Sequence, residues 1–288
     1  MGGPATVEER DVTVGAPWSL TAGRPHPGLA LDVLGYFGYA KRAAGPIVRR
    51  EVPHGVVTLM LAFGDPMDFL PPTGSGPPVD RMVSFAGGLH EVHTHTRHDG
   101  RHQGIEVHLT ALGASRVLGV ASTALANTAV PVDAIRGRSA GALVERLAGL
   151  PDWPARFRLL DRALLGWIDD APPPDPAVSW AWSQLQRSRG RVRVSALADE
   201  IGWSGRHFAD RFRAGIGLTP KAFGRILRFR RAVELLTTGP PASIGEVAAA
   251  CGFSDHSHLV RDFRALAGCT PTELMADRDA QAAPRTTP

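Results

Sequence analysis

Several features are scarce or missing in this sequence, and each absence narrows what the chain can be. No apolar run approaches the roughly 18 residues of a membrane-spanning helix, and no charged leader precedes a hydrophobic segment. We therefore expect neither a membrane span nor a secretory signal, and we expect the protein in the cytoplasm. Residues 1–250 contain no cysteine, so no cysteine nucleophile is available in that part of the chain.

Lysine is almost absent, since only Lys41 and Lys221 occur, and arginine carries nearly all the positive charge. The net charge of +4 is unevenly placed. Residues 176–288 hold 16 basic and 10 acidic side chains, whereas residues 1–175 hold 16 and 18. The basic surplus therefore lies in the C-terminal part, as a phosphate-binding surface requires. A length of 288 residues with 43% hydrophobic residues indicates a globular chain of about two domains.

One pattern occurs twice between residues 194 and 274. The matching positions are Ala198, Gly202, Ser204, Phe212, Gly217 and Thr219 in the first copy, and Ala248, Gly252, Ser254, Phe263, Gly268 and Thr270 in the second. The offset is 50 residues before the second helix of each copy and 51 within it, so one residue is inserted. The alanine lets two helices cross closely, the first glycine ends a helix at positive φ, and the serine caps the next helix. Two helix-turn-helix units are predicted, because an ordinary helical core does not explain a repeated turn.

These residues resemble a known family. The stretches LADEIGWSGRHFADRFRAGIGLTPKAFGRILRFRRAVELL and SIGEVAAACGFSDHSHLVRDFRALAGCTPTEL resemble the DNA-binding domain of AraC/XylS-type transcription regulators, over about a third of the chain. The resemblance implies a sequence-specific transcription regulator, not an enzyme. It would read two successive major grooves with helices 204–214 and 255–266. The spacings Ser243-x-x-Glu246 and Thr270-Pro271-x-Glu273 add capping boxes at two further helix starts.

The resemblance also assigns residues that would contact DNA. The positions matching the family's base-reading residues are Arg206, Ala209 and Asp210 in the first helix, and His256, Ser257 and Arg261 in the second. By type, Arg206 can bond guanine, Asp210 can accept from cytosine or orient an arginine, and Ala209 is limited to methyl contact. For the second helix, contact with phosphates alone is the alternative. A connector from Thr219-Pro220 to Leu236 is expected to leave Arg225, Arg228 and Arg231 largely outside, and we expect the first two to contact DNA.

The N-terminal region reads as short strands followed by helices. Strands are expected at 56–61, 82–85 and 105–109, and amphipathic helices at 140–150 and 154–168. These helices either pack on their own sheet or form a dimer interface. The stretches GYFGYAKR, PHGVVTLMLAFGDP and HDGRHQGIEVHLTALGASRVLGV are similar to cupin-like sensor domains that precede this DNA-binding domain. The predicted fold class is α+β: a small antiparallel β barrel or sandwich with C-terminal helices, then an all-α domain with two helix-turn-helix motifs.

Histidine is concentrated in one stretch, since six of the eleven lie between residues 90 and 108. His93 and His95 would lie on one face of a strand, and with Asp99 or Glu106 as a further ligand they are weak candidates for a metal site. The spacing departs from the cupin pattern of His-x-His followed by a nearby glutamate. The alternative is a solvated polar loop, and we expect no cofactor.

The expected organisation is a flexible arm at 1–28, a sensor or oligomerisation domain at 29–170, a stiff proline-rich linker at 171–177, the DNA-binding domain at 178–279 and a disordered tail at 280–288. The expected partner is double-stranded DNA, with RNA polymerase, a small-molecule effector and a second copy of the chain as candidate partners and no membrane. Two alternatives stay open for the N-terminal domain: a metal-binding cupin-like enzyme domain, or a module that binds a protein partner. Fusions with a methyl-accepting DNA-repair or amidotransferase-like domain are excluded, because residues 1–250 lack the cysteine they need.

Overall fold

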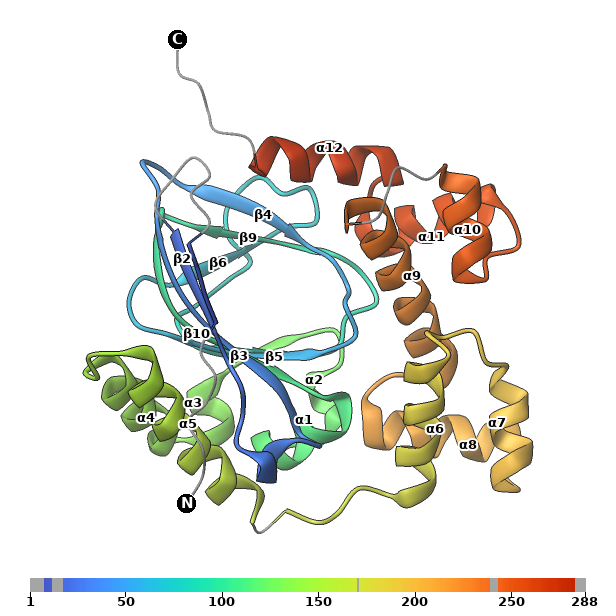
Figure 1. Cartoon of the computed structure of the whole chain (residues 1–288), viewed down its shortest axis with the longest axis horizontal. Helices are drawn as coiled ribbons and strands as arrows, with labels where there is room; N and C mark the ends of the chain where they lie inside the picture. The colour runs from blue at the N-terminus through green and yellow to red at the C-terminus, as the bar shows by residue number, and fades with distance from the viewer. Residues whose placement is uncertain (1–7, 12–17, 170, 239–242, 283–288) are drawn as a thin grey trace.

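The computed structural model describes residues 8–11, 18–169, 171–238 and 243–282. Figure 1 shows two parts side by side: an N-terminal domain built on β-sheets, and a helical C-terminal domain whose two groups of helices are joined by one long helix. No helix among the described residues is long and apolar enough to cross a membrane.

The N-terminal domain contains two antiparallel sheets within the described ranges. The larger has the order β1 (Glu8–Asp11), β2 (Trp18–Gly23), β3 (Val33–Arg42), β10 (Arg101–Leu109), β5 (Val57–Ala62), β8 (Phe85–Gly87) and β11 (Ala129–Pro131). The smaller has the order β4 (Ile47–Glu51), β9 (Thr94–His98), β6 (Met67–Leu70) and β7 (Asp80–Met82). Figure 1 shows the two sheets facing one another. The predicted antiparallel β architecture is confirmed.

The main core lies between the larger sheet and the helices that cover it. On β10, Ile105, Val107 and Leu109 are fully buried, while the residues that alternate with them are half-buried. Because side chains alternate across a strand, all three project from one face of the sheet. They join one apolar cluster with Phe157 and Leu160 of α5. The helices of this domain are α1 (Ala111–Leu118), α2 (Ser122–Leu125), α3 (Val132–Arg136), α4 (Arg138–Ala148) and α5 (Trp153–Ile168), and a 3-10 turn, η1 (Pro27–Leu29), precedes β3.

The expected strand at 82–85 is two strands in different sheets. Met82 ends β7 of the smaller sheet, and Phe85 begins β8 of the larger one. Both side chains join Tyr39, Met60 and Met67 in a small cluster separate from the main core. Two buried residues three positions apart do not fit the period of two that one strand imposes, so the chain crosses between the sheets at residues 83–84.

The expected loose arm at 1–28 is wrong for its described part. Residues Trp18–Gly23 form β2, which pairs with β3 along its whole length. The signal was the alternation of Trp18, Leu20 and Ala22, which is typical of a strand. Residues 1–7 and 12–17 lie outside the described residues. At the other end of the chain, α12 extends through Ala282 into the expected tail.

The two expected helices of the N-terminal domain are confirmed as α4 and α5. Asp152 caps α5, because its carboxylate accepts a hydrogen bond of 2.7 Å from the Ala155 amide. Leu143 and Leu147 of α4 are buried in the same cluster as the sheet. These helices therefore pack on their own domain.

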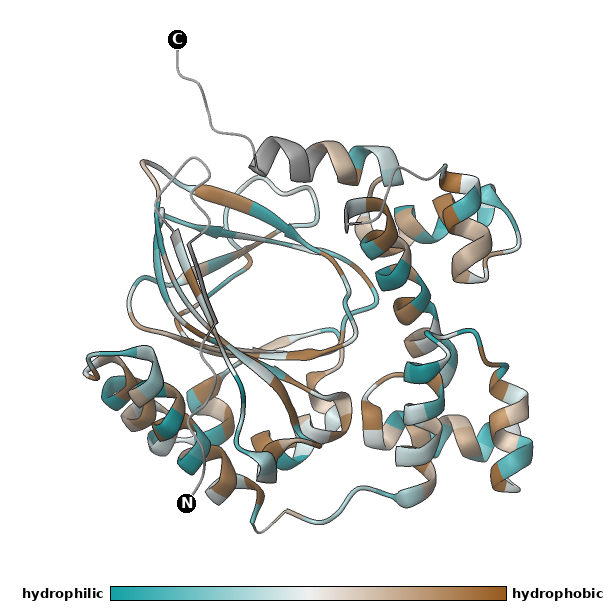
Figure 2. Cartoon of the chain, in the orientation of Figure 1, coloured by the Kyte–Doolittle hydropathy of each residue, from teal (hydrophilic) through white to brown (hydrophobic). Residues whose placement is uncertain are grey.

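The C-terminal domain is all helical, as predicted. Its helices are α6 (Pro176–Arg187), α7 (Val194–Ile201), α8 (Gly205–Ile216), α9 (Pro220–Thr238), α10 (Ile244–Cys251), α11 (His256–Ala267) and α12 (Pro271–Ala282). Figure 2 shows apolar and polar residues alternating along these helices, as amphipathic helices require. Both predicted capping boxes form: Ser243 with Glu246 before α10, and Thr270 with Glu273 before α12.

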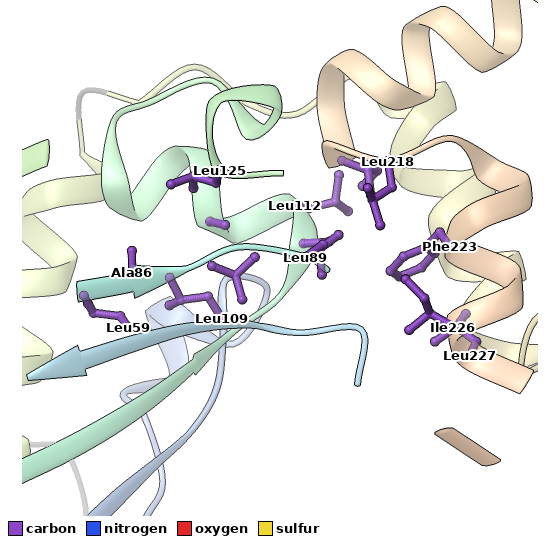
Figure 3. Packing of buried hydrophobic residues seen from close by; sticks show 14 of the residues in the cluster. Leu59, Ala86, Leu89, Leu109, Leu112, Leu125, Leu218, Phe223, Ile226 and Leu227 are labelled. Carbon is purple, nitrogen blue, oxygen red and sulfur yellow. The ribbon is translucent and has the colours of Figure 1, made fainter. Parts of the chain in front are cut away.

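The two domains share an apolar interface, although the linker suggested that they would pack as distinct units. Leu89 and Leu112 of the N-terminal domain face Leu218, Phe223, Ile226 and Leu227 of the C-terminal domain (Figure 3), and all belong to one buried cluster. A proline-rich spacer fixes its own conformation, but it does not prevent the domains that it joins from packing together.

Candidate nucleic-acid interface

The first predicted recognition helix, α8, begins at the expected turn. Gly202 follows α7 with a φ of 78°, and the Ser204 hydroxyl accepts a hydrogen bond of 3.2 Å from the His207 amide. That hydroxyl satisfies one of the free N–H groups at the start of the helix. Phe208 and Phe212 are fully buried and anchor α8 to the rest of the domain.

The opposite face of α8 is open to solvent. Arg206 and Asp210 are exposed, and Ala209 between them is half-buried. In the described part of the chain, no hydrogen bond or ion pair engages the side chain of Arg206 or Asp210. We call this surface the reading face of α8. Arg206 carries the guanidinium fork that pairs with base edges in protein–DNA complexes, and its contact with a base stays a prediction.

The second predicted recognition helix, α11, begins one residue later than expected. Its cap is Asp255, whose carboxylate accepts a hydrogen bond of 2.7 Å from the His258 amide, whereas Ser254 was predicted to be the cap. Ser254 instead contacts Asp255 and the His258 ring with its hydroxyl. The single inserted residue explains the shift, because within the helix the two copies differ by 51 positions and Asp255 corresponds to Ser204.

The same register aligns the reading residues of α11 with those of α8. Ser257 takes the position of Arg206, and Arg261 takes that of Asp210. Both are exposed, as is the neighbouring His256. Leu259 and Phe263, which are fully buried, anchor this helix and leave a second reading face on its opposite side.

Two further arginines hold equivalent positions but were not predicted to contact DNA. Arg213 on α8 and Arg264 on α11 are both exposed and lie one turn beyond the residues predicted to read bases. The signal in the sequence was the Phe-Arg pair that occurs in both copies. These arginines extend each reading face along its helix.

The arginines of the connector α9 are more deeply placed than the sequence suggested. Arg225 Nε lies 2.9 Å from an oxygen of Asp262, a buried residue of α11. Arg228 Nη1 donates a hydrogen bond of 2.7 Å to the Gly190 carbonyl before α7, and Arg231 pairs with Glu234. The expectation that these side chains lie largely outside was wrong, because Arg225 and Arg228 instead hold α9 against both halves of the domain. Their contact with DNA stays a prediction.

Comparisons with known proteins match this part of the chain. Residues 197–277 match the family model described as a helix-turn-helix domain. The chain is 31% identical over 117 residues to the HTH-type transcriptional activator RhaS of Escherichia fergusonii, across 41% of the chain and 36% of the relative. The C-terminal domain is an AraC-type helix-turn-helix domain. RhaS of Escherichia coli is 33% identical over 88 residues, which is 31% of each protein, so the matches span about a third of these relatives.

Solved structures similar to the chain include AraC-type domains. The DNA-binding domain of AdpA, solved in complex with a target DNA, is 29% identical and covers 37% of this chain and 96% of that one, with a TM-score of 0.34. A regulator with an AraC-type domain from Chromobacterium violaceum is 29% identical and covers 36% and 92%, with a TM-score of 0.33. ToxT from Vibrio cholerae is 10% identical and covers 82% and 98%, with a TM-score of 0.45.

The N-terminal domain contacts the C-terminal end of each recognition helix of the AraC-type domain. The Ser122 hydroxyl donates a hydrogen bond of 2.9 Å to the Gly215 carbonyl at the end of α8. Arg50 Nη1 donates one of 3.0 Å to the Ala267 carbonyl at the end of α11. Gly217 and Gly268, the equivalent glycines that end the two helices, have φ angles of 97° and 69°. A methyl group at either glycine would meet the N-terminal domain, at Ser122 or at His93.

Three of the candidate metal ligands, His93, His95 and Glu106, do not come together in one site. The rings of His93 and His95 lie 5.2 Å apart at right angles, and that of His93 lies against Gly268. Glu106 is engaged elsewhere, 2.7 Å from the His108 ring. No group of three or more His, Cys, Asp or Glu side chains in the described ranges could hold a metal ion.

Proposed function

We propose that this protein is a DNA-binding transcription regulator that reads specific sequences with α8 and α11. The observation that carries the proposal is the pair of reading faces. Each recognition helix is capped at its start, anchored by two buried apolar side chains and exposed on the opposite side. The basic surplus of residues 176–288 favours approach to phosphates. The matches to RhaS, a transcriptional activator, support the same function.

One chain can present both helices to one face of DNA. The connector α9 has 19 residues, which span about 28 Å at 1.5 Å per residue. Successive major grooves on one face of B-DNA lie about 34 Å apart. Phe229 of α9 packs on Phe263 of α11 with ring centroids 4.8 Å apart, and Phe223 lies 6.2 Å from Phe212 of α8. The connector therefore holds the two reading faces at a nearly fixed separation.

We further propose that an effector bound to the N-terminal domain controls this reading. The contacts at Gly215 and Ala267 give that domain a direct mechanical connection to both recognition helices. RNA polymerase and a second copy of the chain are the remaining candidate partners, and the proposed compartment is the cytoplasm. We assign the N-terminal domain no catalytic role.

The experiment that tests the function is selection of bound fragments from genomic DNA by the purified full chain, followed by footprinting. We expect a recurrent sequence with two protected segments one helical turn apart. The control is the variant Arg206→Ala with Arg261→Ala, which removes one exposed arginine from each reading face. Equal, sequence-independent recovery of DNA by the wild type and this variant would refute the proposal.

A further inference from the structure

An open cleft of about 710 Å³ lies within the C-terminal domain, between the loop that joins α6 to α7, the connector α9 and the end of α10. Four arginines line it: Arg187, Arg189, Arg191 and Arg231. Among the residues that the structure describes, no carboxylate lines the cleft. Figure 1 shows the α6–α7 loop passing between the two groups of helices. Because the lining residues come from this loop, from α9 and from the end of α10, the cleft lies between the two helix-turn-helix units.

The positive charge of the cleft is only partly balanced. Arg231 pairs with Glu234 at 3.3 Å, but no hydrogen bond or ion pair engages the exposed side chains of Arg189 and Arg191 within the residues that the structure describes. Arg189 and Arg191 lie beside Cys251, the buried last residue of α10. Burial raises the pKa of the Cys251 thiol there, and the charges of Arg231, Arg189 and Arg191 oppose that rise.

The loop that carries these arginines is held in place. Arg189 and Gly190 have φ angles of 51° and 76°, and the Gly190 carbonyl accepts the 2.7 Å hydrogen bond from Arg228. A side chain at Gly190 would collide with the backbone of Gly224 on α9. A loop fixed in this way loses little backbone conformational freedom when its arginines bind a ligand.

The position of the cleft indicates what it would hold. The stem of Arg191 lies against Gly252, where an added methyl group would be 3.2 Å from its Cγ. Gly252 begins the turn that leads to the reading face of α11. On the other side, the loop runs directly into α7, the first helix of the first motif, and such helices cross the DNA backbone. With DNA on both reading faces, as the proposed function requires, these arginines would lie beside the backbone between the two grooves.

We propose that this cleft is a phosphate-binding site that holds the DNA sugar–phosphate backbone between the two grooves that α8 and α11 read. Guanidinium groups match the geometry of phosphate oxygens and bind them bidentately. The inference rests on the proposed function, since it requires DNA on both reading faces. The cleft adds affinity without sequence preference, because phosphates carry no base information.

The test uses the full chain with both substitutions, Arg189→Gln and Arg191→Gln, and compares it with the wild type. DNA binding is measured on a duplex of random sequence and on the operator, which is the recurrent sequence selected from genomic DNA. Removing two phosphate contacts should reduce the slope of log K against log[salt] by about 2. Affinity for both duplexes should fall by the same factor, about tenfold to a hundredfold, and the ranking of single-base operator variants should stay unchanged. Arg189→Lys with Arg191→Lys keeps the charge and should keep the slope, which separates loss of contact from loss of folding.

The matched control is Arg158→Gln with Arg162→Gln, which removes the same charge from two exposed positions on α5 of the N-terminal domain. This control should leave the slope unchanged. A wild-type slope in the Arg189/Arg191 glutamine variant overturns the inference and leaves the proposed function standing. Absence of any salt-dependent DNA binding by the wild type overturns the proposed function itself.

A free phosphorylated compound is the other source of the same chemistry. Calorimetric titration with tripolyphosphate distinguishes it from DNA. The assignment to the DNA backbone is overturned by two results together. Tripolyphosphate binds the wild type stoichiometrically but not the Arg189/Arg191 glutamine variant, and that variant keeps the wild-type slope of log K against log[salt] for DNA.

Discussion

The Ser122 hydroxyl, in the N-terminal domain, donates a hydrogen bond of 2.9 Å to the Gly215 carbonyl in the last turn of α8. Carbonyl groups at the end of a helix have no partner within the helix, so this bond satisfies one of them from another domain. Arg50 does the same for Ala267 at the end of α11. The end of each recognition helix is thus completed by the N-terminal domain.

We predict that Ser122→Ala loosens the last turn of α8 without unfolding the protein. A hydrogen bond of this kind contributes about 1 kcal/mol, so amide exchange in that turn should accelerate about threefold to tenfold. Hydrogen exchange of the full chain measures this, with Ser139→Ala as control, since the Ser139 hydroxyl bonds to the Arg136 carbonyl of its own domain. Unchanged protection at residues 213–217 would show that the contact does not stabilise the helix end.

Arg206→Ala should weaken binding to the operator by about 1–3 kcal/mol and relax preference at one base pair. The side chain is exposed and free on the reading face of α8, so its loss leaves the backbone of the helix unchanged. Competition binding across single-base operator variants measures this. Arg211→Ala is the matched control, because Arg211 is on the same helix but pairs with Asp175 at 2.6 Å. Uniform weakening across all variants by Arg206→Ala would mean that it contacts only the backbone.

Arg225→Ala should destabilise the C-terminal domain by about 2–4 kcal/mol, because it leaves the buried carboxylate of Asp262 without its partner. Adding Asp262→Asn removes that charge and should recover part of the loss. Denaturant unfolding of the two single variants and the double variant gives the coupling energy. Additive effects, with no recovery in the double variant, would contradict this account of the pair.

The isolated segment 175–279 should bind DNA but be less stable than the same domain in the full chain. If it neutralises about six to eight phosphates, log K should fall against log[salt] with a slope of roughly −5 to −7. Removing the N-terminal domain exposes Phe223, Ile226 and Leu227, and each buried side chain of this size contributes about 1.5–3 kcal/mol. Denaturant unfolding of the C-terminal domain is measured in the isolated segment and in the full chain, and the two unfolding midpoints are compared. Equal midpoints would show that the shared interface contributes nothing to stability.

The N-terminal domain should lose stability on acidification. Burial lowers the pKa of both His98 and His102 to about 4. In the unfolded chain these groups take up protons below about pH 6.5, so the free energy of unfolding falls from that pH down to about pH 4. The loss is on the order of 3 kcal/mol per ring. Urea unfolding at pH 7 and at about pH 4.5 measures this loss. His102→Phe should reduce the difference in unfolding free energy between the two pH values, whereas His256→Gln, at an exposed position, should leave it unchanged.

The repeated motif made the C-terminal domain predictable, because caps, turn glycines and anchors are local features of the sequence. Ser204, Gly202 and the Phe208/Phe212 pair hold the predicted places. The offset predicts the inserted residue, but the pairing of Ser254 with Ser204 predicts the wrong cap, because Asp255 caps α11. The residue that caps a helix depends on where the first turn begins. Ser254 and Asp255 are adjacent and can both cap a helix, so residue type alone does not predict which one does.

The contacts between domains could not be predicted in the same way. Arg225 was placed outside by helical spacing, yet it pairs with Asp262 across 37 positions of sequence. Spacing along one helix predicts the direction of a side chain, but it does not predict which residue of another helix will contact that side chain. The histidines show the same limit of local patterns: His93 and His95 are neighbours in sequence and in space, but the fold uses Glu106 to bond His108.

Because Gly217 and Gly268 are equivalent positions in the two copies, the N-terminal domain holds both recognition helices at the same end. Each helix has 12 residues and is about 18 Å long, with the residues predicted to read bases in its first half. The contacts with the N-terminal domain are therefore made at the end of each helix that lies away from those residues. A rotation of about 10° there displaces the opposite end by about 3 Å, which is the length of a hydrogen bond to a base. A tilt of the N-terminal domain that carried both helix ends with it would shift the two reading faces together relative to the DNA grooves.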